Sequence, residues 1–381
     1  MLLAALLLAA APGVTDTEVV LGISAPLSGP AAAWGSISLA AEAWARHINA
    51  AGGVNGRKLR VVIKDDAYNP GQAVANVNEM KDSAFALVLL LGTAVLNANK
   101  DTVAEAGIPT VWPLGNPQVF AAQPKEKVKG VFMAYPDYTD EAQFLVAQAA
   151  KLEQAKKIAV FFQNDDYGKG GLEGVRLGVK KASLTIAAEV PYEVADRELG
   201  THALKLKESG ADTVVLYSTT THGAGIVKEM AKVGYRPKIF AAFPLGDRSV
   251  MYRLLGDLWE GAYYDVNEAP PGDPDADRVV AALLQEEPKL KGRESFGIIG
   301  VTAMTVTVEG LKRAGRDLTR EKFVAALETL HDYRPENLTP PIDWSPSQRH
   351  GLNTVRLLRA KKAADLSFTA VTDWQIFPHH F

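Results

Sequence analysis

The sequence predicts an α/β protein with two similar lobes, each built on a doubly wound parallel sheet. From residue 19 onward, short apolar runs alternate with stretches of helical periodicity, an order that is typical of parallel sheets. The run from Phe85 to Leu91 is apolar at every position, as a strand that is covered on both faces must be. A second cycle of the same kind begins at Ile158, and 381 residues exceed what one ordinary core accommodates.

The first unit of this pattern runs from Val19 to Gly53. An apolar strand leads into a loop rich in proline, serine and glycine, which falls where open α/β sheets bind ligands. Trp34, the one large aromatic residue of this loop, belongs either to a binding wall or to the core. We expect Ser36 to cap the following helix and Gly52 with Gly53 to end it. One face of that helix is apolar, at Ile37, Ala41, Trp44 and Ile48.

The remaining elements follow the same alternation. Strands are expected at residues 59–64, 85–91, 108–112, 158–162, 184–190, 214–217 and 239–242, and antiparallel ones at 353–359 and 370–377. Helices are expected at residues 71–82, 94–106, 169–181, 199–209, 222–233 and, as a long apolar helix, 296–311. We expect residues 17–137 with 265–340 to form an N-terminal lobe, and 138–264 with 341–381 to form a C-terminal lobe. The chain then crosses between the lobes several times, and such crossovers make hinges.

The first 13 residues are expected to be a secretory signal peptide. Met1 to Ala11 is continuously apolar and ends in three alanines, and Pro12 with Gly13 ends the run at a length too short to span a bilayer. The usual basic residues before the apolar run are missing, and the alternative is a buried helix. The pattern favours a protein that is periplasmic or otherwise exported, and soluble once the signal peptide is removed.

Composition and motifs argue against several functions. The net charge of -3 favours neither nucleic acid nor an anionic membrane as a partner. There are no cysteines, and no phosphate-binding, nucleophile-elbow or zinc-protease motif occurs. The acid pairs Asp65-Asp66 and Asp165-Asp166 follow strands, where aspartate commonly caps turns, and His379-His380 is interpreted as a solvated pair in the tail. We therefore expect no enzyme activity, no cofactor and no metal site.

Several stretches, taken in order, resemble one family. They are LGISAPLSGPAAAWG, INAAGGVNGRKL, DDAYNPGQAV, FFQNDDYGKG, GIIGVTAMTVTVEGLKRAG and PIDWSPSQRHG. With this set the chain resembles the periplasmic solute-binding proteins of ABC transporters, in the leucine/isoleucine/valine-binding (type I) branch, over nearly its whole mature length. The resemblance implies two lobes joined by a three-strand hinge that close around a small molecule, in a protein that is a monomer.

The resemblance also implies ligand-binding residues in the first lobe. Thr93 and Ala94 fall where the family places its serine, and they offer amides, a hydroxyl and a helix N-terminus to a ligand carboxylate. The alternative for Thr93 is that it only caps the helix. Gly115 and Asn116 are expected to add amides, and Trp34 falls where the family has an aromatic wall.

In the second lobe, Asp137 corresponds to an acidic position that faces a ligand ammonium, and Tyr167 to a tyrosine that closes over the ligand. The alternative for Tyr167 is packing at a helix start. Thr220 ends a strand that faces the cleft. The family glutamate that holds an amino group is absent, and Leu245 lies in the segment that stands in its place. A buried ammonium without that partner would be costly to desolvate.

These inferences lead to one expected function and two alternatives. We expect an exported solute-binding component of an ABC importer. It would capture a small carboxylate-bearing ligand, a branched-chain or other apolar amino acid, and deliver it to a membrane permease. The alternatives are a binding protein for an aromatic or other amine-free organic acid, and a ligand-sensing partner of a receptor.

Overall fold

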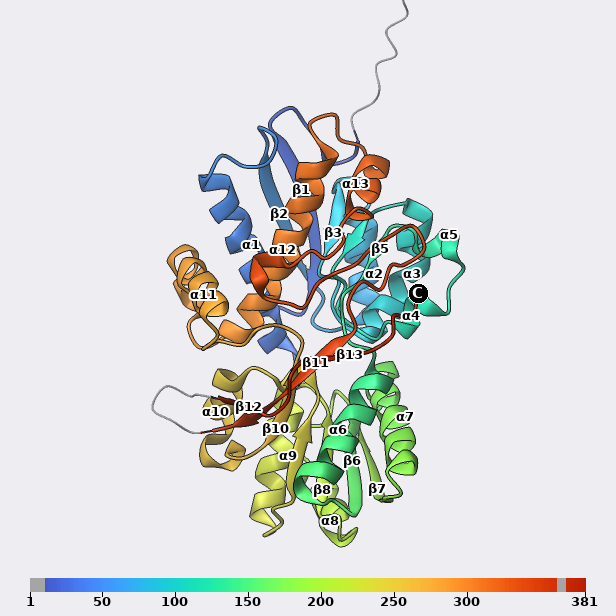
Figure 1. Ribbon diagram of the computed structural model, residues 1–381, viewed down its shortest axis with the longest axis vertical. Coiled ribbons are helices and arrows are strands. Elements are labelled where there is room, and N and C mark those ends of the chain that lie inside the picture. The colour runs from blue at the N-terminus through green and yellow to red at the C-terminus, as the bar shows by residue number, and fades with distance from the viewer. Residues whose placement is uncertain (1–10, 362–367) are drawn as a thin grey trace, which may run out of the picture.

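The computed structural model describes residues 11–361 and 368–381 and shows two lobes stacked along the long axis of the molecule (Figure 1). Most of the expected signal peptide, residues 1–10, lies outside the described residues. Within the described ranges, no helix is both long enough and apolar enough to cross a bilayer.

The first lobe is built on a parallel sheet of five strands in the order β2-β1-β3-β4-β5. The strands are β1 (Glu18–Ala25), β2 (Lys58–Asp65), β3 (Ala86–Val88), β4 (Thr110–Val111) and β5 (Val131–Phe132). The expected strand at 85–91 is shorter in the structure, because Leu89 takes a left-handed conformation, with φ of 57°, that interrupts the regular strand. Backbone pairing with the following segment continues beyond it as an isolated parallel bridge between Leu91 and Leu114.

Helices cover this sheet on both faces. They are α1 (Gly35–Ala50), α2 (Pro70–Met80), α3 (Thr93–Ala106), α4 (Gln118–Ala121), α5 (Lys125–Val128), α11 (Pro274–Glu286), α12 (Glu294–Ala314) and α13 (Arg320–Leu327). The apolar face expected around Trp44 packs on α12, and the Trp44 indole donates a hydrogen bond to Thr305 at 3.0 Å. Gly300 of α12 allows this close approach, because a Cβ there would lie 2.1 Å from the Ile37 carbonyl oxygen.

The start of α1 differs from expectation. A short 3-10 turn (Ala32–Trp34) leads directly into the helix, and Trp34 occupies the N-cap position. Ser36 is therefore not the cap: it lies inside the first turn, and its hydroxyl donates to the Ala33 carbonyl at 2.6 Å.

The second lobe repeats the strand order of the first. Its sheet runs β7-β6-β8-β9-β10-β11-β12, and the first five strands are parallel. They are β6 (Lys157–Gln163), β7 (Thr185–Tyr192), β8 (Thr213–Tyr217), β9 (Lys238–Ala241) and β10 (Tyr263–Val266). The helices of this lobe are α6 (Tyr138–Glu153), α7 (Asp166–Lys181), α8 (Gly200–Glu208), α9 (Thr220–Lys232) and α10 (Arg248–Leu255). The expected antiparallel strands are β11 (Thr354–Ala360), which pairs with β10, and β12 (Phe368–Ala370) with β13 (Gln375–Ile376), which pair with β11.

The expected fold of two similar lobes joined by a three-strand hinge is confirmed. The crossing segments are residues 133–137, 267–273 and 350–353. One expected boundary is wrong: residues 341–353 do not join the second lobe. Trp344 packs edge-on against Trp112 and Phe132 of the first lobe, and its indole donates to the Met133 carbonyl at 3.0 Å. This apolar burial keeps the segment on the first lobe until β11 begins.

The C-terminal tail also returns to the first lobe (Figure 1). The Phe381 ring packs against Phe120, and the Phe381 carbonyl accepts the amide of Arg349 at 2.8 Å. The tail thus runs alongside the third crossing segment and contacts it next to the hinge.

Candidate functional site

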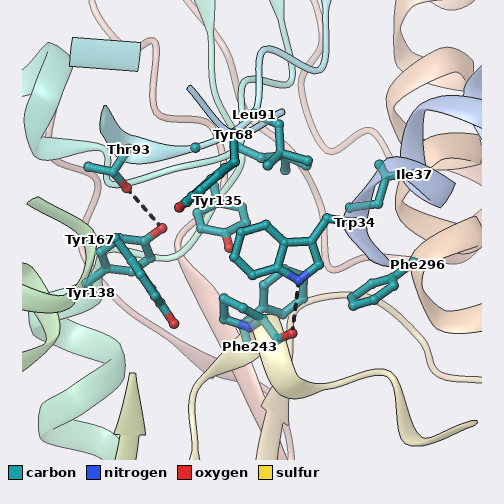
Figure 2. A pocket seen from close by; sticks show the side chains of 13 residues that line it. Trp34, Ile37, Tyr68, Leu91, Thr93, Tyr135, Tyr138, Tyr167, Phe243 and Phe296 are labelled. Carbon is teal, nitrogen blue, oxygen red and sulfur yellow. Dashed lines mark hydrogen bonds between the residues drawn. The ribbon is translucent and has the colours of Figure 1, made fainter. Parts of the chain in front are cut away.

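A cavity lies between the lobes where the carboxyl edges of the two sheets meet (Figure 2). Its empty space, part of which is open to solvent, is about 380 Å³. It is lined by Trp34, Ile37, Tyr68, Leu91, Gly92, Thr93, Leu114, Tyr135, Tyr138, Tyr167, Phe243, Pro244 and Phe296. Seven of these side chains are aromatic. No acidic or basic side chain occurs among the described residues that line it, so the cavity is built for an apolar body with few polar contacts.

The topology of both lobes explains this location. In each sheet the strand order reverses beside the first strand, between β1 and β3 and between β6 and β8. Loops at such a switch point diverge and leave a crevice at the carboxyl ends of the strands. Trp34 follows β1, Thr93 follows β3 and Tyr167 follows β6, so each comes from a switch-point loop.

Thr93 is the first residue of α3, and it brings a side-chain hydroxyl to the cavity beside that of Tyr138. The hydroxyl donates to the Tyr138 hydroxyl at 3.3 Å and accepts the Asn116 amide at 3.1 Å. Gly92, not Thr93, is the N-cap residue, and α3 has no side-chain cap. The first amides of α3 have no partner within the helix and make its N-terminus attractive to an anion.

Gly92 is required by the shape of this end. Its φ is 111°, which non-glycine residues avoid, and an added Cβ would lie 2.8 Å from the Tyr68 ring. The glycine therefore lets the chain pass under Tyr68 and brings the start of α3 to the cavity.

Trp34 joins the two lobes across the cavity. Its indole N–H lies 3.1 Å from the Thr220 hydroxyl and 3.3 Å from the Pro244 carbonyl, both of the second lobe. Two further contacts cross nearby: Asn97 donates to Asp166 at 2.9 Å, and Thr221 to the Pro30 carbonyl at 3.1 Å. These bonds describe a closed arrangement of the lobes.

The aromatic side chains form one connected wall. Tyr138 makes edge contacts with Tyr135 and Tyr167, with ring centroids 6.0 and 5.2 Å apart, and Tyr68 meets Trp34 edge-on at 5.5 Å. Burial raises the pKa values of Tyr135, Tyr138 and Tyr167 well above the usual range for tyrosine. Their hydroxyls therefore stay protonated and act as neutral hydrogen-bonding groups, and that of Tyr167 donates to the Ser218 carbonyl at 3.4 Å.

A profile of the periplasmic binding protein family matches residues 18–365. The chain belongs to this family. A relative from Brucella melitensis, Leu/Ile/Val-binding protein homolog 3, is 26% identical over 323 residues, which is 84% of both chains. The leucine-, isoleucine-, valine-, threonine-, and alanine-binding protein of Pseudomonas aeruginosa is 25% identical over 317 residues, 81% of this chain and 82% of its own.

Solved structures of similar fold include a branched chain amino acid ABC transporter protein from Thermus thermophilus with bound valine. It has a TM-score of 0.84 at 19% identity and covers 95% of this chain and 97% of its own. A fatty acid ABC transporter substrate-binding protein from Thermomonospora curvata has a TM-score of 0.82 at 22% identity, with 96% and 94% covered.

In this periplasmic binding protein, three of the expected binding residues line the cavity: Trp34, Thr93 and Tyr167. Asn116 lies behind Thr93 and positions its hydroxyl, and Thr220 lies behind Trp34. Other expected residues do not line the cavity. They are Ala94, Gly115 and Leu245, whose neighbours Thr93, Leu114 and Pro244 take those places.

Asp137 is not an ammonium partner in this structure. It is fully buried and caps α6, and one carboxylate oxygen accepts the amides of Thr139 and Asp140 at 2.9 and 3.2 Å. The other accepts the side-chain amide of Gln118 at 2.8 Å. Both carboxylate oxygens are therefore occupied by the protein, and Asp137 is not among the residues that line the cavity.

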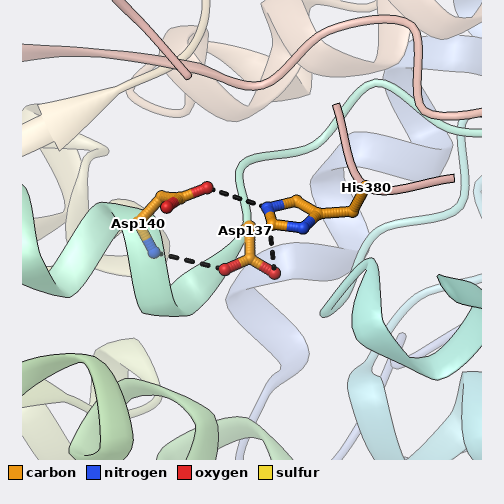
Figure 3. Close-up of side chains that lie close together, drawn as sticks. All are labelled: Asp137, Asp140 and His380. Atoms are coloured by element: carbon orange, nitrogen blue, oxygen red, sulfur yellow. Dashed lines mark hydrogen bonds and ion pairs between the residues drawn. The ribbon is translucent and has the colours of Figure 1, made fainter. Parts of the chain in front are cut away.

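The tail histidines are not a solvated pair as expected. The His380 imidazole lies 2.9 Å from Asp140 and 3.8 Å from Asp137, so the tail is tied to the start of α6 (Figure 3). His379 contacts the His350 carbonyl. The group Asp137, Asp140 and His380 has the residue types of a metal site, with ligand atoms within 4.8 Å of one another, but each carboxylate already has protein partners.

Sequence reasoning missed most of the aromatic wall. Tyr68 follows a strand in a left-handed turn, with φ of 63°, and Phe296 lies on the apolar face of α12, where it has the pattern of a core residue. The signal that could have found Tyr135, Tyr138 and Phe243 is their position just after strand ends, which also marked Trp34 and Thr93.

Proposed function

We propose that this periplasmic binding protein is the exported solute-binding component of an ABC importer. It captures a small ligand with a carboxylate and an apolar body between its lobes and passes it to a membrane permease. The apolar segment at residues 1–13 supports export, and the names of the two relatives, which specify binding of amino acids, support an amino-acid-type ligand. A binding role accounts for the cavity without any catalytic group.

One observation carries the ligand proposal: the start of α3 opens on a cavity whose other walls are mostly aromatic and aliphatic side chains. A carboxylate placed there meets the Thr93 hydroxyl and the unpaired amides of the helix. These groups replace the water molecules that hydrate the carboxylate in solution. The rings of Trp34 and Tyr167 then cover the apolar body. Hydrogen bonds such as that from Trp34 to Thr220 form only when the lobes close, so closure and capture are coupled.

A second candidate ligand is favoured by the lining itself. Among the described residues, the cavity wall has no carboxylate that could pair with an α-ammonium, since Asp137 faces elsewhere. Amine-free acids, either aliphatic or aromatic, bring no ammonium group that would need such a partner. They are therefore an alternative to branched-chain and other apolar amino acids.

Thermal unfolding with matched acids tests the proposal. The panel pairs leucine with 4-methylpentanoate, valine with 3-methylbutanoate and phenylalanine with 3-phenylpropanoate. A ligand present at about 100 times its dissociation constant stabilises the folded state by about 2.7 kcal/mol, which raises the unfolding temperature. A shift with leucine or valine alone supports the amino-acid ligand, and a shift with the amine-free acids alone supports the second candidate. If no carboxylate shifts the temperature, the carboxylate proposal is wrong.

A further inference from the structure

A second chamber continues from the Phe296 end of the cavity. Its empty space, part of which is open to solvent, is about 300 Å³, and it shares two walls with the first cavity, Phe243 and Phe296. Figure 2 places Phe296 at the side of the cavity opposite Thr93, so the chamber lies beyond the end that is farthest from the carboxylate site. Its other walls are Gly246, Asp247, Val266, Glu268, Ala269, Pro270, Ser295 and Ile299.

The wall between the two spaces contains one residue from each lobe. Phe243 follows β9 in the second lobe, and Phe296 lies in the first turn of α12 on the first lobe. Opening of the lobes would separate the two rings and join the spaces. A long ligand could then enter both and be enclosed when the lobes close again.

The chamber is acidic although it is buried. Asp247 is 1% exposed and Glu268 is 4% exposed, and no lysine, arginine or histidine is among the described residues that line the chamber. Asp247 is satisfied: it caps α10 through the Val250 amide at 3.0 Å and accepts the Phe296 amide across the lobes at 3.2 Å. One carboxyl oxygen of Glu268, by contrast, has no hydrogen-bond partner among the described residues.

A buried carboxyl group without a partner is unfavourable unless it is neutral or meets a donor. Glu268 lies on the second crossing segment, at the wall of a space that a ligand of suitable length could reach. An ammonium group would supply both the charge and the hydrogen-bond donors that this carboxyl group lacks. The rings of Phe243 and Phe296 would face the same cation, which aromatic rings attract.

We propose that this chamber receives an amine-bearing end of the ligand, with Glu268 as its ion-pair partner. The inference rests on the proposed capture of a carboxylate at Thr93, and it narrows the ligand to acids that carry the amine at the far end of an apolar chain. The α-amino group of an ordinary amino acid lies beside the carboxylate and would not reach the chamber.

Burial raises the pKa of Glu268 to about 8, so the empty protein holds this group largely protonated at neutral pH. A bound ammonium stabilises the ionised carboxylate, and the Glu268 proton leaves to solvent. Binding of an amine-bearing acid therefore releases a proton, whereas binding of an amine-free acid does not.

Titration calorimetry with acids of matched length tests the inference. The probes are 4-aminobutanoate, 5-aminopentanoate and 6-aminohexanoate, each against the unsubstituted acid of equal length, in two buffers of different ionisation enthalpy. We expect at least one amine-bearing acid to bind tenfold or more tighter than its partner, with proton release. In Glu268→Gln this preference and the proton release disappear, whereas Glu173→Gln, an exposed control on α7, keeps both.

The outcomes separate the two proposals. If the unsubstituted acids bind and the distal amine gives no gain at any length, the chamber inference is wrong and the carboxylate site stands. If Glu268→Gln keeps the full preference for the amine, Glu268 is not its partner and the inference is again wrong. If neither series binds, nor any acid of the panel above, the carboxylate proposal fails and the inference with it.

Discussion

The indole N–H of Trp34, on the first lobe, donates a hydrogen bond of 3.1 Å to the hydroxyl of Thr220, on the second. Thr220 in turn lies 3.2 Å from the Pro244 carbonyl, which Trp34 also reaches. This small network spans the cavity wall and is made of neutral groups only. It links the position of an aromatic wall residue to the closure of the lobes.

Replacement of Trp34 with phenylalanine is expected to weaken closure. An aromatic ring remains at this position, but the hydrogen bonds of the indole N–H to Thr220 and Pro244 are lost. Each such bond is typically worth about 0.5–1.5 kcal/mol. The closed population of the ligand-free protein should fall, which small-angle scattering detects as a larger radius of gyration. Ligand affinity should fall with it, because binding then includes the cost of closing the lobes.

Trp44→Phe is the matched control for that change. Trp44 is also buried and also loses one indole hydrogen bond, to Thr305, but that bond lies within the first lobe. We expect lower stability with no change in the scattering curve. Equal scattering changes in both variants would show that the Trp34 contact does not govern closure.

Replacement of Thr93 with valine is expected to weaken binding of a carboxylate ligand by roughly 1.5–3 kcal/mol, the range for hydrogen bonds to charged groups. Valine keeps the shape of the threonine side chain and removes the hydroxyl, which lies at the start of α3. Thr93→Ser restores the hydroxyl and should retain most of the affinity in calorimetry. If valine binds as tightly as threonine, the carboxylate lies elsewhere.

Replacement of Asp137 with alanine is expected to lower the free energy of unfolding without changing ligand affinity. The carboxylate caps α6, and loss of such a cap typically costs about 1 kcal/mol. Asp273→Ala removes the cap of α11 and serves as the control. A large loss of affinity for amino acids in Asp137→Ala alone would instead support the expected role of Asp137 as an ammonium partner.

Glu268 is expected to make stability fall as the pH rises. Burial raises the pKa of its carboxyl group from 4.5 to about 8 in the folded state, so the folded protein retains a proton that the unfolded chain releases. The stabilisation is complete below about pH 4.5 and is lost as the pH approaches 8. Each unit of pKa difference corresponds to about 1.4 kcal/mol.

Urea unfolding of Glu268→Gln measures this contribution. Glutamine does not titrate, so the variant should match the natural protein at about pH 4 and exceed its stability by at least 1 kcal/mol, on the order given by the pKa difference, at about pH 9. Asp66 and Asp247, whose pKa values burial also raises to about 6, are present in both proteins and cancel in the comparison. A constant difference at both pH values would show that Glu268 does not titrate in this range.

The elements of the fold follow closely from local pattern. Strand β6 and the long helix α12 lie where continuous apolar runs predict them, because burial on both faces requires such runs. The position of Trp344 could not be predicted in this way. It lies in a segment without periodicity, and only its packing against Phe132 shows to which lobe the segment belongs.

The site follows from the sequence only in part. Thr93 and Trp34 stand directly after strands, where the topology of a parallel sheet places binding loops whatever the ligand. The roles of Phe296 and Asp137 cannot be predicted from the sequence pattern. An apolar residue in a cavity wall has the same pattern as one in the core. An aspartate that caps a helix has the same sequence signal as one that binds a cation. Those two assignments depend on what each side chain faces.

The alternation of strands and helices, the two lobes and the position of the first cleft loops are thus determined by the order of residues, because local periodicity and strand connectivity leave few alternatives. The closed arrangement, the aromatic wall and the buried Glu268 were decided by the tertiary structure. Each depends on contacts between segments far apart in the chain, such as Trp34 with Thr220, whose partners no local pattern specifies.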